Sequence, residues 1–138
     1  MFKITALDHV GIRVLDRDRS LAFYSKLGFR VDPHENAPAY RAVGLVNDAG
    51  VRIHLIYNGV SYAEGKNPLM DQLIKWPGYT HGAVIVDSMD ELVLWLAEQD
   101  IPITEGPATA GDGRRKLCFI RDPDRNVIEF NEILDHST

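Results

Sequence analysis

The stretch that decides the fold is His9-Val10-Gly11-Ile12-Arg13-Val14, because it returns in similar form as His81-Gly82-Ala83-Val84-Ile85-Val86. Each copy is a short apolar run typical of a strand, and each is followed by apolar residues at helical spacing. The alignment continues without a gap beyond these runs, so that Asp18 falls on Asp90. Self-similarity of this kind predicts a chain built from two repeated modules.

Each module is predicted to run strand, helix and then three strands. The first helix begins near Asp16 and ends at Gly28, a residue favoured just after helices, while Ser88 opens the second as part of a Ser-x-x-Glu capping box. The strands after the helices are expected at about Phe29–Asp32, Ala39–Val46, Val51–Tyr57, Ile101–Thr104, Arg115–Arg121 and Asn126–Glu132. Asn58–Tyr79 has no counterpart in the second half, and a short helix is expected there around Pro68–Lys75.

This pattern predicts a single α+β domain over residues 1–138. The first module covers about residues 1–58, a connector about 59–78 and the second module about 79–134. With 138 residues, the chain is long enough for one domain with a proper hydrophobic core.

Composition narrows the possible partners and the location. Fifteen basic and 20 acidic residues give a formal net charge of −5, and without a basic stripe such a chain is repelled by nucleic acid. No apolar run is long enough to span a membrane, and the N-terminus lacks the layout of a signal peptide. The single cysteine, Cys118, excludes an internal disulfide and fits a reducing cytoplasm. A cytoplasmic protein that binds neither nucleic acid nor membranes is therefore expected.

Four polar residues occupy equivalent points of the two modules. His9 and His81 stand at the same position of the repeated first strand, and alignment of the last strands places His54 over Glu129. His54 and Glu129 each lie between apolar neighbours, so they face away from the side that packs on the helix. If the two sheets join into one curved surface, all four residues converge.

Three imidazoles and one carboxylate suit a borderline divalent ion such as Zn²⁺, Ni²⁺, Co²⁺ or Fe²⁺. A single inward histidine is more often a hydrogen-bonded core or cleft residue than a ligand. Here three of the five histidines fall on repeat-equivalent positions and an acid completes the set, which favours a metal site. His34, in a turn-rich stretch, and His136, in a polar tail, are assigned no role.

These motifs, from Leu7-Asp8-His9-Val10 to Asp122-Pro123 and on to Ile128-Glu129-Phe130, resemble the vicinal oxygen chelate superfamily. That superfamily includes glyoxalase I, extradiol dioxygenases, methylmalonyl-CoA epimerase, and fosfomycin and bleomycin resistance proteins. The resemblance implies that two paired βαβββ modules form an eight-stranded, cup-shaped mixed sheet with the helices outside. It also implies a metal inside the cup, on the residues that match the family's ligands: His9, His54, His81 and Glu129.

Glyoxalase I is the subgroup with the most similar local pattern. The resemblance implies a substrate-binding Arg13 in the first strand and a substrate-binding Asn58 at the end of His54-Leu55-Ile56-Tyr57-Asn58. The stretch from Lys116 to Phe119 fits the same pattern, although His54 replaces the usual glutamate. The implied activity is a metal-dependent lyase or isomerase that chelates a small oxo- or hydroxy-carbonyl compound through two oxygens. Glu129 would be the base, and His54 a ligand or second proton carrier.

Each substrate-binding candidate also has an ordinary structural interpretation. Arg13 has the same strand parity as His9 and suits a substrate carboxylate, or an ion pair with a neighbouring acid. Asn58 suits substrate contact or turn capping. Lys116 belongs to a basic run beside Gly111-Asp112-Gly113, which suits a lid over an anionic substrate or a solvated hairpin tip.

Two other functions stay open. His9, His81 and Glu129 would supply the two-histidine, one-carboxylate triad of an iron-dependent extradiol-type dioxygenase, with His54 as a neighbouring acid–base group. A metal-free protein that binds or sequesters a drug is the other alternative. The family resemblance also implies a homodimer.

Overall fold

Two sheets with the same strand order make up the fold, one in each half of the chain. The structure is a computed structural model and describes residues 1–63 and 65–134. Its two compact units are Met1–Ser61 and Tyr62–Thr138, here named module 1 and module 2. His136, for which the sequence predicts no role, lies outside the described residues. Over the described part of the chain, no helix is long and apolar enough to cross a bilayer.

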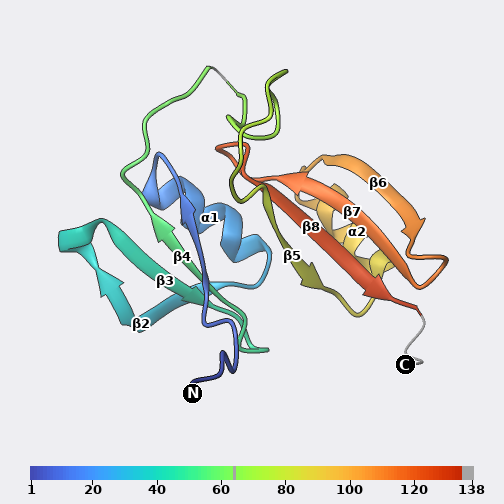
Figure 1. Ribbon diagram of the computed structural model, residues 1–138, viewed down its shortest axis with the longest axis horizontal. Helices are drawn as coiled ribbons and strands as arrows, with labels where there is room; N and C mark the ends of the chain where they lie inside the picture. Colours follow the sequence, from blue (N-terminus) through green and yellow to red (C-terminus); the bar gives the residue numbers. More distant parts are fainter. Residues whose placement is uncertain (64, 135–138) are drawn as a thin grey trace. The chain divides into compact units, whose positions relative to one another are not determined.

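Module 1 consists of a four-stranded mixed sheet and one α-helix (Figure 1). Its strands are ordered β1-β4-β3-β2, with β1 parallel to β4 and the other neighbours antiparallel. Along the chain the elements are β1 (Val10–Arg13), α1 (Arg17–Lys26), β2 (Arg30–Ala37), the 3₁₀ helix η1 (Pro38–Tyr40), β3 (Ala42–Val46) and β4 (Arg52–Ile56).

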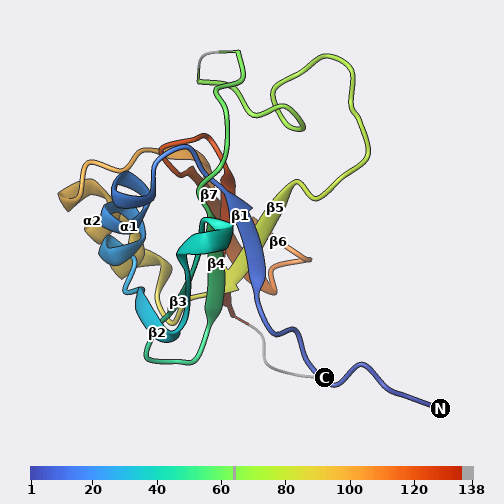
Figure 2. The same ribbon diagram turned by 90° about the vertical axis from the view of Figure 1, so that its left-hand side faces the viewer.

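Module 2 repeats this arrangement. Its strands are ordered β5-β8-β7-β6, with β5 parallel to β8, and α2 lies on one side of the sheet (Figure 2). The elements are β5 (His81–Ile85), α2 (Met89–Glu98), β6 (Ile103–Ala110), β7 (Arg115–Arg121) and β8 (Val127–Ile133). The predicted α+β class and the strand–helix–three-strand order of both modules are confirmed.

Both helices begin at the capping residues that the sequence predicts. Asp16 accepts a hydrogen bond of 2.7 Å at Oδ1 from the backbone N–H of Arg19, and Ser88 accepts one of 3.2 Å at Oγ from the N–H of Glu91. After α1 ends, Gly28 takes a φ of 94°, a left-handed conformation that costs glycine little. Local capping chemistry therefore sets the helix boundaries.

The core of each module lies between its helix and one face of its sheet. Burying a large apolar side chain stabilises the folded state by about 1.5–3 kcal/mol. The least exposed apolar residues are Val14, Tyr24, Val43, Leu45 and Leu55 in module 1, and Met89, Leu96, Cys118, Ile120 and Phe130 in module 2. Because side chains alternate along a strand, the intervening, more polar residues face the opposite side of each sheet.

Strand β2 is longer than predicted. The sequence suggests a strand that ends at Asp32 and then turns, whereas β2 continues to Ala37. The stretch between Val31 and Asn36 forms an irregularity in the pairing with β3. Such a bulge on an edge strand accommodates Pro33 without breaking the pairing on either side. Strand β6 likewise continues beyond the predicted end and has two register shifts.

The connector contains turns where a short helix was predicted, so the expectation for Pro68–Lys75 is wrong. The side chain of Asn67 accepts hydrogen bonds at Oδ1 from the N–H groups of Leu69 and Met70 (2.9 and 3.1 Å), and the carboxylate of Asp71 bends back to accept from the N–H of Asn67 (2.6 Å). These side-chain bonds close a compact turn instead of continuing into a helix.

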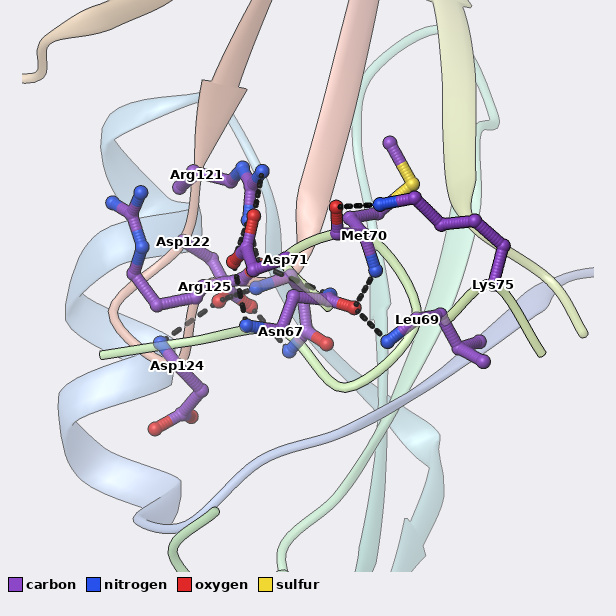
Figure 3. A network of polar contacts seen from close by, with 10 residues as sticks. Asn67, Leu69, Met70, Asp71, Lys75, Arg121, Asp122, Asp124 and Arg125 are labelled. Atoms are coloured by element: carbon purple, nitrogen blue, oxygen red, sulfur yellow. Dashed lines mark hydrogen bonds and ion pairs between the residues drawn. The ribbon is translucent and has the colours of Figure 1, made fainter. Parts of the chain in front are cut away.

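A polar network fastens this turn to the loop between β7 and β8 (Figure 3). Arg121 donates from Nη1 and Nη2 to the two carboxylate oxygens of Asp71, both at 3.0 Å. Arg121 and Asn67 also donate to the carbonyl oxygen of Arg125, at 3.1 and 3.2 Å. The turn at Asn67 is thus held to the β7–β8 loop by charge-assisted hydrogen bonds.

Asp71→Asn is expected to lower the free energy of unfolding by about 1–2 kcal/mol at neutral pH. Hydrogen bonding from Arg121 lowers the pKa of Asp71 below its usual 3.8. The ionised carboxylate therefore stabilises the fold above that value, and the stabilisation is lost as the pH falls through the lowered, folded-state pKa. Urea denaturation of both proteins should show a difference in the free energy of unfolding at pH 7, and this difference should disappear as the pH falls below 3.8 through the lowered pKa of Asp71.

Asp48→Asn is the matched control, because Asp48 forms its ion pair with Arg30 at a fully exposed carboxylate. Exposed pairs of this kind contribute little. Equal effects of the two substitutions, or a difference for Asp71→Asn that does not depend on pH, would contradict the role given to the Asp71–Arg121 pair.

Candidate functional site

His9 and His54 lie together on the face of the module 1 sheet that points away from the core. His54 sits in β4 between Ile53 and Leu55, which are 8% and 0% exposed, so its side chain points to the other side. His9 directly precedes β1, the neighbour of β4. The two rings stack with centroids 3.6 Å apart and planes 10° from parallel. The two candidate ligands of module 1 are therefore in contact.

A hydrogen bond orients the ring of His9, and burial affects the protonation of His54. Nδ1 of His9 lies 2.7 Å from Oδ2 of Asp8, and this hydrogen bond lowers the pKa of Asp8. Because the carboxylate is then ionised, the imidazole donates to it from Nδ1. Burial lowers the pKa of His54, and the charge of His9 lowers it further. His54 is thus neutral at pH 7, the form in which imidazole binds metal ions.

Gly44 in β3 makes room beside His54, its partner in β4. A Cβ at this position would lie 2.5 Å from Cβ of Glu35 and 3.2 Å from Nε2 of His54. Nε2 itself is buried and has no hydrogen-bond partner among the described residues. Arg52 pairs with both Asp32 and Glu35, at 3.1 and 3.5 Å. The sheet face around His54 therefore combines a charged network with one imidazole nitrogen that lacks a partner.

In module 2, His81 and Glu129 lie on neighbouring parallel strands. Nε2 of His81 is 3.4 Å from Oε1 of Glu129, and β5 pairs with β8 in a register that sets Ala83 opposite Glu129. The other ring nitrogen of His81, Nδ1, is 2.8 Å from Oγ1 of Thr80. The two candidate ligands of module 2 are thus within reach of each other, as are the two candidate ligands of module 1.

The Glu129 carboxylate is held by a second residue of its own strand. Asn131, which is 3% exposed, donates from Nδ2 to Oε2 of Glu129. Arg115 of β7 donates from Nη1 to Oδ1 of Asn131 at 3.3 Å. A chain of hydrogen bonds therefore runs from Arg115 through Asn131 to one oxygen of Glu129, while the other oxygen faces His81.

The spacing of these donor atoms bears on whether they suit a divalent ion. Two donors on a tetrahedral ion at about 2.1 Å lie roughly 3.4 Å apart. The distance of 3.4 Å between His81 and Glu129 matches that spacing. Nδ1 of His9 is engaged by Asp8 and Nδ1 of His81 approaches Thr80, an outer contact that is usual for metal-binding histidines.

His54 fits less well than the other three candidates. A ring nitrogen binds a metal ion in the plane of its ring, and the planes of His9 and His54 are nearly parallel and stacked. One ion cannot lie in both planes, so both rings can be ligands only if one of them turns. Within the ranges that the structure describes, no group of three or more His, Cys, Asp or Glu side chains is arranged to hold a metal ion.

Two of the predicted substrate-binding residues contact each other. Arg13, at the end of β1, donates from Nε to Oδ1 of Asn58 at 3.0 Å. Asn58 follows β4, the parallel neighbour of β1. The amide thereby orients the guanidinium group of Arg13, which has the same strand parity as His9.

Lys116 lies on the opposite face of the module 2 sheet from Glu129. In β7, Phe119 pairs with Glu129 and Lys116 pairs with Glu132, so Lys116 shares its face with the fully buried Cys118. Burial raises the pKa of the Cys118 thiol, which therefore stays protonated and acts as a packing residue. Two basic residues of β7, Arg115 and Arg121, have the strand parity of the Glu129 face, and Arg115 is the neighbour of Lys116.

Several residues around the candidate ligands are not predicted from the sequence. Asn131 could have been found, because a step of two along β8 from Glu129 leads to it. Arg115 needs the register between β7 and β8, which depends on the turn that joins them. Glu35 had no signal, since it reaches His54 only through the bulge in β2.

A family model for the Glyoxalase/Bleomycin resistance protein/Dioxygenase superfamily matches residues 6–130. The match covers most of the chain, both modules and all four candidate ligands. The chain therefore belongs to this superfamily, which agrees with the resemblance seen in the sequence.

Individual relatives are distant. The glyoxalase domain-containing protein RDO1 of Mycosarcoma maydis is 27% identical over 135 residues, which cover 96% of this chain and 70% of that protein. A glyoxalase/dioxygenase from Nostoc punctiforme has a TM-score of 0.72 at 20% identity, covering 98% of this chain and 99% of the other. TnmS3, an antibiotic binding protein from Streptomyces sp. CB03234, has a TM-score of 0.70 at 20% identity, covering 96% and 99%. The two structures share the fold with this chain.

Proposed function

We propose that the chain is a divalent-metal-dependent enzyme with glyoxalase I-like lyase or isomerase activity on a small oxo- or hydroxy-carbonyl compound. The main support is that each module presents one pair of candidate ligands, His9 with His54 and His81 with Glu129. The contacts of Asp8 and Thr80 with the Nδ1 atoms leave Nε2 of His9 and His81 for the ion. Zn²⁺, Ni²⁺, Co²⁺ and Fe²⁺ all suit this donor set.

In this proposal Glu129 is the general base. A bound divalent ion would supply Lewis-acid stabilisation of negative charge on the two adjacent oxygens of the substrate. Oε1 of Glu129 takes a proton from one of the two substrate carbons that carry these oxygens and returns it to the other carbon. Meanwhile the side chain of Asn131 donates a hydrogen bond to Oε2. His54, half-buried and neutral, is a further ligand or a second proton carrier.

The substrate would be oriented by cationic and amide groups. Arg13, held by Asn58, suits an anionic group at a distance from the reacting carbon. Lys116 is proposed as a further anion contact at the hairpin, although its strand parity differs from that of Glu129. The proposed substrate thus combines two adjacent oxygens with an anionic group.

A second candidate, an iron-dependent extradiol-type dioxygenase, is favoured by one observation. The rings of His9 and His54 are stacked, so one ion cannot bind both of them as they stand. A triad of His9, His81 and Glu129 does not use His54 as a ligand, and neither ring then has to turn. Two histidines and one carboxylate are the usual ligands of non-haem iron oxygenases. His54 would then serve as an acid–base group beside the triad.

Metal analysis of protein purified without added ions is the test. We expect one ion per chain, Zn or Ni, with no consumption of oxygen. His9→Ala and His81→Ala should each remove it or weaken its binding, because both histidines are proposed ligands. Iron(II) with oxygen uptake would instead support the dioxygenase. Protein without metal affinity would instead favour a metal-free binder of small molecules. TnmS3, a protein with the same fold, is an antibiotic binding protein.

We further propose that the protein is a cytoplasmic homodimer. The single cysteine fits a reducing compartment, and dimers are common in this superfamily. Light scattering coupled to size-exclusion chromatography distinguishes a dimer from a monomer of 15.5 kDa.

A further inference from the structure

The side chain of Asn131 is polar and buried in module 2, at a position where packing alone does not require a polar group. It is 3% exposed, on the same face of β8 as Glu129, and its two hydrogen bonds go to side chains, those of Glu129 and Arg115. Burying an amide is costly unless its donors and acceptor are satisfied. An apolar residue of similar size would fill the same space at no such cost, so the amide serves its partners rather than the packing.

The two partners fix the orientation of this amide. A guanidinium group can only donate and a carboxylate can only accept, so Oδ1 of Asn131 faces Arg115 and Nδ2 faces Glu129. The reverse orientation would place like groups against each other at both ends. Arg115 therefore selects the rotamer in which Asn131 donates to Oε2 of Glu129.

We propose that Asn131 is the positioning residue of Glu129, which it restricts to acting through Oε1 alone. With Oε2 engaged by the amide, the carboxylate cannot rotate, and Oε1 stays directed at Nε2 of His81, 3.4 Å away. Glu129 then offers one oxygen, not two, to an ion or to a substrate proton. This inference rests on the proposed function, because it assigns Glu129 the same role.

Binding of Co²⁺ to the metal-free protein tests the proposal. Asn131→Leu keeps the approximate volume and removes the donor, and it should weaken Co²⁺ binding about 10–100-fold, the usual effect of losing a partner that orients a ligand. The visible absorption of the saturated variant should also change, because the released carboxylate can bind through both oxygens. Asn126→Leu is the matched control: it breaks a hydrogen bond of 2.9 Å from an asparagine amide to Oδ2 of Asp122 in the same module.

An unchanged Co²⁺ affinity and spectrum in Asn131→Leu, or an equal loss in Asn126→Leu, would overturn the proposal. If the wild-type protein binds no Co²⁺, the proposed function fails and the positioning role is judged on the metal-free protein. Asn131→Leu and Glu129→Leu should then lower the Tm by amounts that do not add in the double variant, because both break one hydrogen bond. Additive shifts in Tm would overturn it.

Discussion

Glu129→Gln is expected to lower turnover by about 10²–10⁴-fold, the usual contribution of a general base. Glutamine has the shape of glutamate but cannot take up a proton, so the carbon acid loses its acceptor. The imidazoles of His9 and His81 remain as donors, and the ion should stay bound, with lower affinity. Proton NMR in D₂O measures the step directly, as exchange of deuterium into the carbon next to the carbonyl of an α-oxo or α-hydroxy carbonyl compound.

Glu132→Gln is the control for this prediction. Glu132 is three residues further along β8, on the opposite face, where it pairs with Lys116. The rate of deuterium exchange catalysed by the Glu132→Gln variant should match that of the wild type. Full exchange in Glu129→Gln at saturating metal would exclude Glu129 as the base, and equal losses in both variants would point to a general effect on the strand.

Gly44→Ala is expected to destabilise the protein by about 1–3 kcal/mol, the typical cost of overpacking. The added Cβ would meet Cβ of Glu35 at 2.5 Å and Nε2 of His54 at 3.2 Å, so the bulged part of β2 must shift. Because Glu35 also pairs with Arg52, the shift should disturb that ion pair as well. Urea denaturation gives the free energy of unfolding of both proteins.

Gly11→Ala is the matched substitution in the same sheet. Gly11 is opposite His54 on the other neighbouring strand, and a Cβ there would have one ordinary contact, 3.7 Å to Cδ1 of Ile56. The repeat-equivalent residue of module 2 is already alanine, Ala83. We expect little change in stability for Gly11→Ala. If both substitutions lowered the free energy of unfolding by similar amounts, the sheet would need glycine at both positions for a general reason. The specific role of Gly44 in making room for Glu35 would then be contradicted.

Signals that act within a few residues predicted the fold well. Asp16, Gly28 and Ser88 are found at the helix ends that their chemistry indicates, and the strand β7 has the predicted bounds. The predictions were wrong where contacts between residues distant in the sequence determine the local structure. The turn at Asn67 is closed by side chains that also bind the β7–β8 loop, and the bulge in β2 depends on pairing with β3.

For the candidate site, strand parity was informative only where the register was simple. Alternation places His54 and Glu129 away from the core face, and each contacts a histidine at the start of the neighbouring parallel strand. Lys116 was chosen from a basic run without its register, and the pairing of β7 with β8 places it on the other face. The hydrogen bond between Arg13 and Asn58 joins residues 45 positions apart, which the sequence pattern does not predict.

The identical strand order of the two sheets is the arrangement that duplication and fusion of a gene for one module would leave. Once both copies are part of one polypeptide, a mutation in one is no longer imposed on the other. A protein formed from two identical one-module subunits must carry the same residue at both equivalent points. This chain instead carries histidine at position 54 and glutamate at position 129, so the two equivalent positions can take different chemical roles.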